Sequence, residues 1–176
     1  MSFSGNYFQL FGLPVTHQMD QQRLDAEYEK LSLETHPDFF TQAPPEEQQE
    51  AHRRSAQVNE GYRILGNESR RAAYLLGLLV QQAEGGVELN QTALPDGFLQ
   101  EMFFLQEELE EFDPAADPHH TEKLRAQFRE RLESVATERG QLFTEALREV
   151  RQETLQAIQT NLNCEKYLLR LMERLG

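Results

Sequence analysis

A histidine, a proline and an aspartate stand side by side at His36, Pro37 and Asp38, and two of these side chains could carry chemistry. An aspartate carboxylate can hold an imidazole in one tautomer, so His36 could be a general base with Asp38 as its orienting partner. The same two side chains could supply part of a metal site. A proline between them could instead fix a loop that displays both side chains to another protein. The remaining interpretation is a loop that ends a helix and carries incidental polar residues.

The rest of the sequence supplies few parts for an active site. The local sequence contains no neighbouring nucleophile motif, and the chain has no GxxxxGK[ST] phosphate-binding loop. The adjacent pair His119 and His120 belongs to another part of the chain, has no recognised ligand spacing, and is expected to form the polar start of a helix. His17 and His52 are expected to be surface residues. A hydrolase or a metal site would therefore rest on the His-Pro-Asp segment.

The single cysteine, Cys164, limits covalent and metal chemistry further. This chain can form no intrachain disulfide and no thiolate cluster by itself, which fits a reducing compartment. Nothing nearby in the sequence would lower the pKa of the Cys164 thiol, so we expect a small packed side chain in the last helix.

The net charge of the chain disfavours some classes of binding partner. The sequence has 30 acidic against 17 basic side chains and a formal net charge of -13, which repels phosphate backbones and anionic membranes. No segment approaches the roughly 20 apolar residues needed to span a bilayer, and the first residues lack a basic leader. We therefore expect a cytoplasmic protein without nucleic-acid or membrane partners.

The His-Pro-Asp segment is expected to lie between two antiparallel helices. Asp20 is a plausible N-cap of the first helix, which must end near Thr35 because Pro37 lacks an N–H and disfavours helical geometry before it. The second helix starts at Pro44 or Pro45 and ends at a Gly66 cap. Their apolar faces follow helical spacing, with Leu24, Tyr28 and Leu31 in the first helix and Ala51, Ser55, Val58, Tyr62 and Leu65 in the second.

Residues 81–96 are expected to link two units, 1–80 and 97–176. This stretch contains Gly85, Gly86, Asn90 and Pro95 and has little apolar periodicity. Three amphipathic helices with short connections then predict an antiparallel bundle. Their expected core residues are Phe98, Met102, Leu105, Leu109 and Phe112, then Leu124, Phe128, Leu132, Val135, Leu142, Phe143 and Ala146 in a helix from about Thr121, and finally Leu155, Ile158, Leu162, Leu169 and Met172.

An acidic run in the first bundle helix indicates a second candidate surface. Between Asp96 and Asp113 the sequence has seven acidic residues and no base. Leu99 and Phe103 lie beside the expected core seam, one turn before Glu107, with Glu111 one turn further on. An exposed apolar patch continued by carboxylates would suit a partner protein. The alternative is a wide core stripe beside an ordinary solvated acidic face.

The first half of the chain resembles the J domain of DnaJ-class co-chaperones. The resemblance is carried by the segment NYFQLFGLP, the helix from Asp20 to Thr35, the His-Pro-Asp segment and the run VNEGYRILGNESRRAAYLL. More narrowly, NYFQLFGLP, RAAYLL and a small helical C-terminal unit resemble the HscB family of iron–sulfur cluster assembly co-chaperones. The resemblance implies an all-α fold in which a J domain and a three-helix bundle form an L.

The resemblance also implies a function without bond chemistry in this chain and without a cofactor of its own. His36, Pro37 and Asp38 would bind a DnaK-class chaperone, HscA, and stimulate its ATPase. The bundle would bind the scaffold protein IscU, through the contact candidates Leu99, Phe103, Glu107, Glu111 and Tyr167. The alternatives are a general J-domain co-chaperone with another client and, from a different class, a hydrolase that uses His36 and Asp38.

The sequence departs from the family pattern at several positions. The helix before His36 has only Arg23 and Lys30 as bases, against five acidic residues, where J domains are usually basic. Phe39 stands where a lysine commonly follows the aspartate. Gln100 and Phe104 also replace the residue types expected in the scaffold-binding helix, so that patch is expected to be more aromatic than usual.

Overall fold

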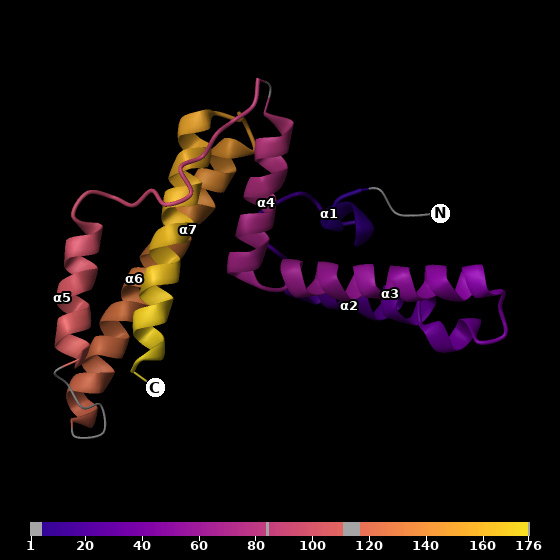
Figure 1. Cartoon of the computed structure of the whole chain (residues 1–176), viewed down its shortest axis with the longest axis horizontal. Helices are drawn as coiled ribbons and strands as arrows, with labels where there is room; N and C mark the ends of the chain where they lie inside the picture. The colour runs from indigo at the N-terminus through magenta and orange to yellow at the C-terminus, as the bar shows by residue number, and fades with distance from the viewer. Residues whose placement is uncertain (1–4, 84, 111–116, 176) are drawn as a thin grey trace. The chain divides into compact units, whose positions relative to one another are not determined.

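The computed structural model describes residues 5–83, 85–110 and 117–175, and within these ranges every regular element is a helix (Figure 1). The predicted all-α class is confirmed. The chain forms two compact units, Met1–Leu75 and Leu76–Gly176, whose division falls within helix α4 (Glu68–Gln82). No helix of the described residues is long and apolar enough to cross a membrane.

The first unit begins with a short helix, α1 (Tyr7–Leu10), held by a capping box. The Asn6 side chain accepts from the backbone N–H of Gln9 at 3.0 Å, and the backbone N–H of Asn6 donates to the Gln9 side chain at 3.1 Å. Phe8, Phe11 and Leu13 are buried, so α1 and the turn after it belong to the core of this unit.

Helices α2 (Gln21–Glu34) and α3 (Pro45–Leu65) pack side by side as the predicted hairpin (Figure 1). Asp20 caps α2 by accepting from the backbone N–H of Arg23 at 3.1 Å, as predicted. The rings of Tyr28 and Tyr62 stack between the helices with centroids 4.1 Å apart. The Tyr62 hydroxyl donates to Asp25 at 2.9 Å, and this hydrogen bond raises the pKa of Tyr62. The buried apolar residues of the hairpin are Leu24, Ala51, Val58 and Leu65.

Two glycines of α3 have different structural roles. Gly66 is the C-cap, as predicted, but its φ of −73° is right-handed, so the cap does not use the left-handed conformation open to glycine. Gly61 lies inside the helix, where a Cβ would come within 2.8 Å of the rings of Phe11 and Tyr7. The absence of a side chain at Gly61 therefore lets α1 and its turn approach α3.

His17 is buried, and the prediction of a surface residue was wrong. Its residue is only 6% exposed, because Arg71 of α4 folds over this segment and donates from Nε to the His17 carbonyl at 2.8 Å. A second guanidinium nitrogen of Arg71 donates to the carbonyl of Leu65. Glu68 also lies near the imidazole, 4.0 Å from Nε2. This burial depends on residues more than 50 positions away, so the local sequence carried no sign of it.

The second unit contains α5 (Phe98–Glu110), α6 (Pro118–Ala146) and α7 (Gln152–Glu173). The three helices share one core, as predicted for the bundle, and α6 lies along α7 (Figure 1). Asp117 caps α6 by accepting from the backbone N–H of His120, so the two adjacent histidines lie in its first turn, as predicted. Phe112 lies outside the described residues. One core cluster consists of Met102, Leu124, Phe128, Leu168, Leu171 and Leu175. The predicted core residues Phe143, Ala146, Leu155, Ile158 and Leu162 are buried as well.

Leu169 was predicted in this core but is 40% exposed. The buried face of α7 runs instead from Leu162 through Glu165 to Leu168. Glu165 occupies a core position because it pairs with Arg139 of α6, which is fully buried, at 2.9 Å between Nη1 and Oε1. The prediction assigned only apolar residues to the buried face of α7. It therefore passed over Glu165 and chose the wrong residues for that face.

The segment predicted as a linker is fastened to α7. The backbone N–H of Asn90 donates to the side chain of Gln156 at 2.8 Å, and the Gln156 amide donates back to the Asn90 carbonyl at 3.2 Å. The amide of buried Asn163 donates to the carbonyls of Gln91 and Ala93, both at 2.9 Å. Residues 90–93 are therefore held against the second unit by side-chain amides.

Candidate functional site

The His-Pro-Asp segment follows directly after the end of α2, and its backbone leaves the helical conformation there. Thr35 ends the helix, and both its backbone N–H and its hydroxyl donate to the Leu31 carbonyl, at 3.0 and 2.8 Å. His36 is extended, with φ −64° and ψ 124°, as its position before a proline requires. Pro37 then starts a single 3-10 turn, η1 (Pro37–Phe40). The predicted end of the helix near Thr35 is confirmed.

The two side chains of interest are exposed rather than enclosed. The side chain of His36 is 53% exposed and that of Asp38 is 83% exposed. The backbone N–H of Asp38 donates to Nδ1 of His36 at 3.3 Å, and the Asp38 carboxylate lies 3.6 Å from the same nitrogen. An orienting carboxylate needs a proton on Nδ1, whereas this nitrogen accepts from the backbone. The geometry therefore displays the imidazole and the carboxylate side by side and does not form a base–orienter pair.

A side chain of helix α3 forms hydrogen bonds with the residues that follow the displayed turn. The Gln48 amide donates to the carbonyls of Thr41 and Ala43, at 3.3 and 2.8 Å. Within the turn, the Thr41 hydroxyl donates to the Asp38 carbonyl at 3.3 Å, and the backbone N–H of Phe39 donates to the His36 carbonyl at 3.1 Å. The turn is therefore held before any partner binds, which lowers the entropy lost on binding.

The two basic residues of α2 have partners within their own unit. Arg23 donates to the Gly12 carbonyl at 3.1 Å, and Lys30 lies 3.9 Å from Glu27 one turn earlier. Arg23 precedes His36 by 13 residues and Lys30 precedes it by six. The acidic character predicted for α2 is thus not offset by a cluster of basic side chains on that helix.

A second candidate surface is a groove between α5 and α7, with a volume of about 450 Å³. Leu99 and Phe103 line it from α5, with 56% and 57% of their surface exposed, and Tyr167 lines it from α7. The ring of Phe98 meets that of Tyr167 edge to face, with centroids 6.0 Å apart. Three of the predicted scaffold contacts are therefore brought together in one exposed apolar groove.

The two predicted acidic contacts are placed differently. Glu107 is an exposed residue of α5 that is not among the residues lining the groove. Glu111 lies outside the described residues. Two basic residues that sequence reasoning missed also line the groove, Arg170 of α7 and its C-cap Arg174, together with Glu173. Their spacing of three and seven residues after Tyr167 places them on its helical face, which is the signal that could have found them.

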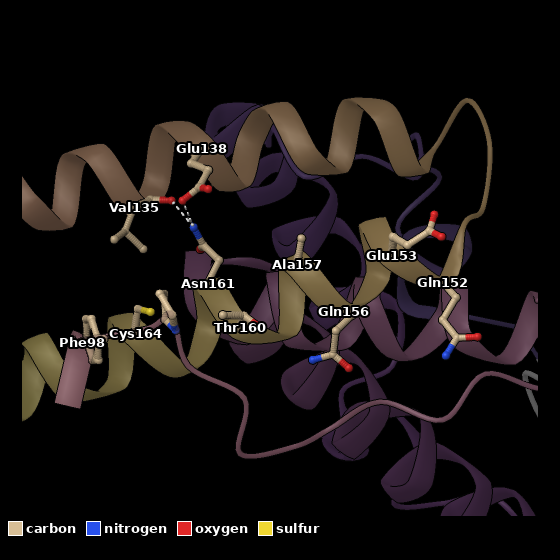
Figure 2. Close-up of a pocket in the computed structure, with 11 residues that line it drawn as sticks. Phe98, Val135, Glu138, Gln152, Glu153, Gln156, Ala157, Thr160, Asn161 and Cys164 are labelled. Atoms are coloured by element: carbon tan, nitrogen blue, oxygen red, sulfur yellow. Dashed lines mark hydrogen bonds between the residues drawn. The ribbon is translucent and has the colours of Figure 1, made fainter.

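A larger pocket of about 770 Å³ lies in the second unit between α6, α7 and the residues before α5 (Figure 2). Figure 2 shows the Asn161 amide donating to the Val135 carbonyl at 3.0 Å and to Glu138 at 2.9 Å. Cys164 lines this pocket, and burial raises the pKa of its thiol to about 11. The thiol is therefore protonated and weakly nucleophilic at neutral pH, as expected for a packed side chain. Within the described residues no three His, Cys, Asp or Glu side chains gather to hold a metal ion.

Comparison with known families separates the same two regions. Residues 6–74 match the DnaJ domain, and residues 94–175 match the HSCB C-terminal oligomerisation domain. A co-chaperone protein HscB homolog of Vibrio campbellii is 34% identical over 155 residues, which cover 83% of this chain and 87% of that protein. The chain belongs to the HscB family of co-chaperones. The displayed His36, Pro37 and Asp38 lie in the region that matches the DnaJ domain, and the groove between α5 and α7 lies in the region that matches the HSCB C-terminal domain.

Other HscB proteins agree in sequence and fold. The HscB homologs of two Vibrio cholerae strains are 39% identical over 116 residues, a stretch that spans 64% of this chain and 64% of theirs. The solved chaperone HscB from Vibrio cholerae has a TM-score of 0.79 at 26% identity, covering 97% of this chain and 95% of its own. Human co-chaperone HscB has the same fold at 21% identity, with a TM-score of 0.80 over 99% of this chain and 82% of its own.

Proposed function

We propose that this HscB-family protein is a non-catalytic co-chaperone that stimulates the ATPase of a DnaK-class chaperone similar to HscA. The observation that carries the proposal is the display of His36 and Asp38 on a braced turn, within the residues that match the DnaJ domain. The two side chains would contact the chaperone and favour its hydrolysis-competent state. Stimulation then comes from contacts that differ between two states of the partner.

The second half of the proposal is delivery of an iron–sulfur scaffold protein similar to IscU. Leu99, Phe103 and Tyr167 form an exposed apolar groove in the domain that matches the HscB C-terminal family. Large exposed apolar and aromatic side chains are frequent at the centres of protein interfaces. Glu107 of α5 and Glu111 would add acidic contacts to the same partner. By this proposal the protein carries no cofactor, binds neither nucleic acid nor membrane, and works in the cytoplasm, where the cluster travels on the scaffold.

The decisive experiment is a titration of the ATPase rate of the DnaK-class chaperone of the same organism, with and without the scaffold protein. The proposal expects stimulation by this protein alone and a more than additive rate when the scaffold is also present. Stimulation without scaffold synergy would favour a general J-domain co-chaperone with another client. Absence of any stimulation would contradict the proposed function.

The hydrolase alternative makes a separate prediction. An enzyme that used His36 and Asp38 would turn over a substrate without a partner chaperone, and a metal enzyme would retain a metal on elemental analysis. The bond from the Asp38 backbone to His36 Nδ1 disfavours the base–orienter geometry that such an enzyme requires.

A further inference from the structure

The two most exposed large hydrophobic side chains of the described residues flank His36. Leu33 is 65% exposed and Phe39 is 72% exposed, more than Leu99, Phe103 or Tyr167 in the groove between α5 and α7. The carbonyl of Leu33 accepts from the backbone N–H of His36 at 3.4 Å. The ring of Phe39 meets the imidazole of His36 edge to face, with centroids 6.0 Å apart. Leu33 and Phe39, here called the apolar pair, therefore adjoin the displayed site directly.

The local structure turns the apolar pair toward solvent. Leu31 is half-buried, whereas Leu33, two residues later, lies about 200° further round the helix and is exposed. Phe39 is held in η1 by the bond from its backbone N–H to the His36 carbonyl. Exposed apolar side chains that adjoin a displayed polar site are typical of a surface covered by a partner protein.

The charged residues around His36 do not favour binding to an acidic surface of a partner. From Glu27 to Arg54 the sequence has three basic residues: Lys30 lies 3.9 Å from Glu27, and Arg53 and Arg54 both pair with Glu50. The acidic residues of the same stretch number seven: Glu27, Glu29, Glu34, Asp38, Glu46, Glu47 and Glu50. An acidic partner surface would be repelled, whereas an apolar one would bury Leu33 and Phe39 without a cost in charge desolvation.

We propose that the apolar pair inserts into an apolar socket of the DnaK-class chaperone, beside the contacts of His36 and Asp38. Hydrophobic burial then supplies the docking affinity that a basic helix would otherwise supply. The inference rests on the proposed co-chaperone function and specifies the partner surface, which is apolar and not acidic. It assigns Leu33 and Phe39 to affinity, and His36 and Asp38 to the stimulated rate.

The test is a titration of chaperone ATPase stimulation with Leu33→Ser, Phe39→Ser and the double variant. We expect each single variant to raise the half-maximal concentration by about 10-fold, the usual effect of losing one well-buried interface side chain. The stimulated rate at saturation should stay within about 2-fold of wild type, because these substitutions weaken binding and do not change the hydrolysis rate of the bound chaperone. Val15→Ser is the matched control, because Val15 is an exposed apolar residue of the same unit at 39% exposure and lies far from His36 in the sequence.

Salt dependence provides a second readout. Between 50 and 500 mM NaCl, values chosen to span about a 3-fold change in Debye length, the half-maximal concentration of the wild-type protein should stay constant or fall. A steep rise with salt would show electrostatic docking and overturn the inference.

The two proposals fail in distinguishable ways. If wild-type protein does not stimulate the chaperone at any concentration, the co-chaperone function itself is contradicted. If wild-type protein stimulates, Asp38→Asn does not, and the apolar-pair variants act at wild-type concentrations, the apolar socket alone is contradicted. Far-ultraviolet circular dichroism and melting temperature establish that each variant is folded. Since both side chains are exposed, their replacement should leave the melting temperature nearly unchanged.

Discussion

Asp38 sets the orientation of His36 through its backbone, because its N–H donates to the imidazole Nδ1 at 3.3 Å. The Asp38 side chain stays 83% exposed and free to face a partner. One residue thus both positions its neighbour and presents a carboxylate, while Pro37 fixes the backbone between them. The backbone N–H of Asp38, which orients His36, and the exposed Asp38 carboxylate are therefore separate contributions. A substitution of the side chain removes only the second.

Asp38→Asn removes the carboxylate charge but keeps the backbone N–H that holds His36. We expect it to reduce stimulation of the chaperone ATPase by roughly 5- to 150-fold, the usual range for coupling between binding sites. His36→Gln should have an effect of the same size. Scaffold affinity should not change, because Leu99, Phe103 and Tyr167 lie in the other unit. Steady-state ATPase assays and isothermal titration measure the two outcomes, with Glu34→Gln as a nearby acidic control. Retained stimulation by Asp38→Asn would remove the carboxylate from the docking site.

Leu99→Ala and Phe103→Ala test the groove between α5 and α7. Each should weaken scaffold binding by about 1–3 kcal/mol, equivalent to roughly 5- to 150-fold in affinity, if these side chains are central contacts. ATPase stimulation without scaffold should be preserved. Leu169→Ala is the matched control, because Leu169 is an exposed residue of α7 that does not line the groove. An unchanged affinity in isothermal titration would show that the scaffold binds elsewhere.

The buried pair of Arg139 and Glu165 predicts a strong effect on stability. Glu165→Ala removes the carboxylate 2.9 Å from a fully buried guanidinium, and we expect a loss of about 3–5 kcal/mol in the free energy of unfolding. The double variant Arg139→Met with Glu165→Leu should recover most of this loss, since it leaves no charge in the core. Urea unfolding followed by circular dichroism measures both.

An exposed ion pair supplies the comparison for that experiment. Glu149→Ala disrupts its pair with Arg151, where both side chains are more than half exposed. Because solvent screens this exposed pair, the urea unfolding curve of Glu149→Ala should nearly coincide with that of the wild-type protein. Equal losses for Glu165→Ala and Glu149→Ala would mean that burial of Glu165 does not decide the stability of the bundle.

The sequence was sufficient where local chemistry dictates structure. Asp20, Pro37 and Pro45 mark helix ends through caps and missing N–H groups, and the structure has those ends where the sequence predicts them. The displayed turn follows from the same residues. The proximity of Leu99 and Phe103 to Tyr167 came from family resemblance, because their separation in the sequence gave no physical reason for contact.

Prediction failed where distant polar residues decide burial. His17 is buried under Arg71, and Glu165 takes a core position because Arg139 meets it from another helix. Apolar periodicity cannot predict the burial of a charged residue when its ion-pair partner lies on a different helix. The misplacement of Leu169 followed directly from passing over Glu165.

Close packing of α1 against α3 gives a paired prediction on two helical glycines. Gly61→Ala places a Cβ within 2.8 Å of the rings of Phe11 and Tyr7, and displacement of either ring disturbs the core of the first unit. We expect a loss of about 1–3 kcal/mol in stability, as for overpacking elsewhere. Gly77→Ala in α4 meets no atom within 4 Å, so the higher helix propensity of alanine should stabilise by up to about 1 kcal/mol.

Melting temperatures of the two alanine variants therefore should move in opposite directions from wild type. The same substitution is made in both helices, so intrinsic propensity favours both variants equally, and the difference between them isolates the ring contacts at Gly61. Phe11→Leu combined with Gly61→Ala provides a further check, since a smaller side chain opposite the new methyl group should recover part of the loss. A Gly61→Ala variant as stable as Gly77→Ala would mean that α1 can move away from α3 without cost, and that this glycine is not required for the packing of the first unit.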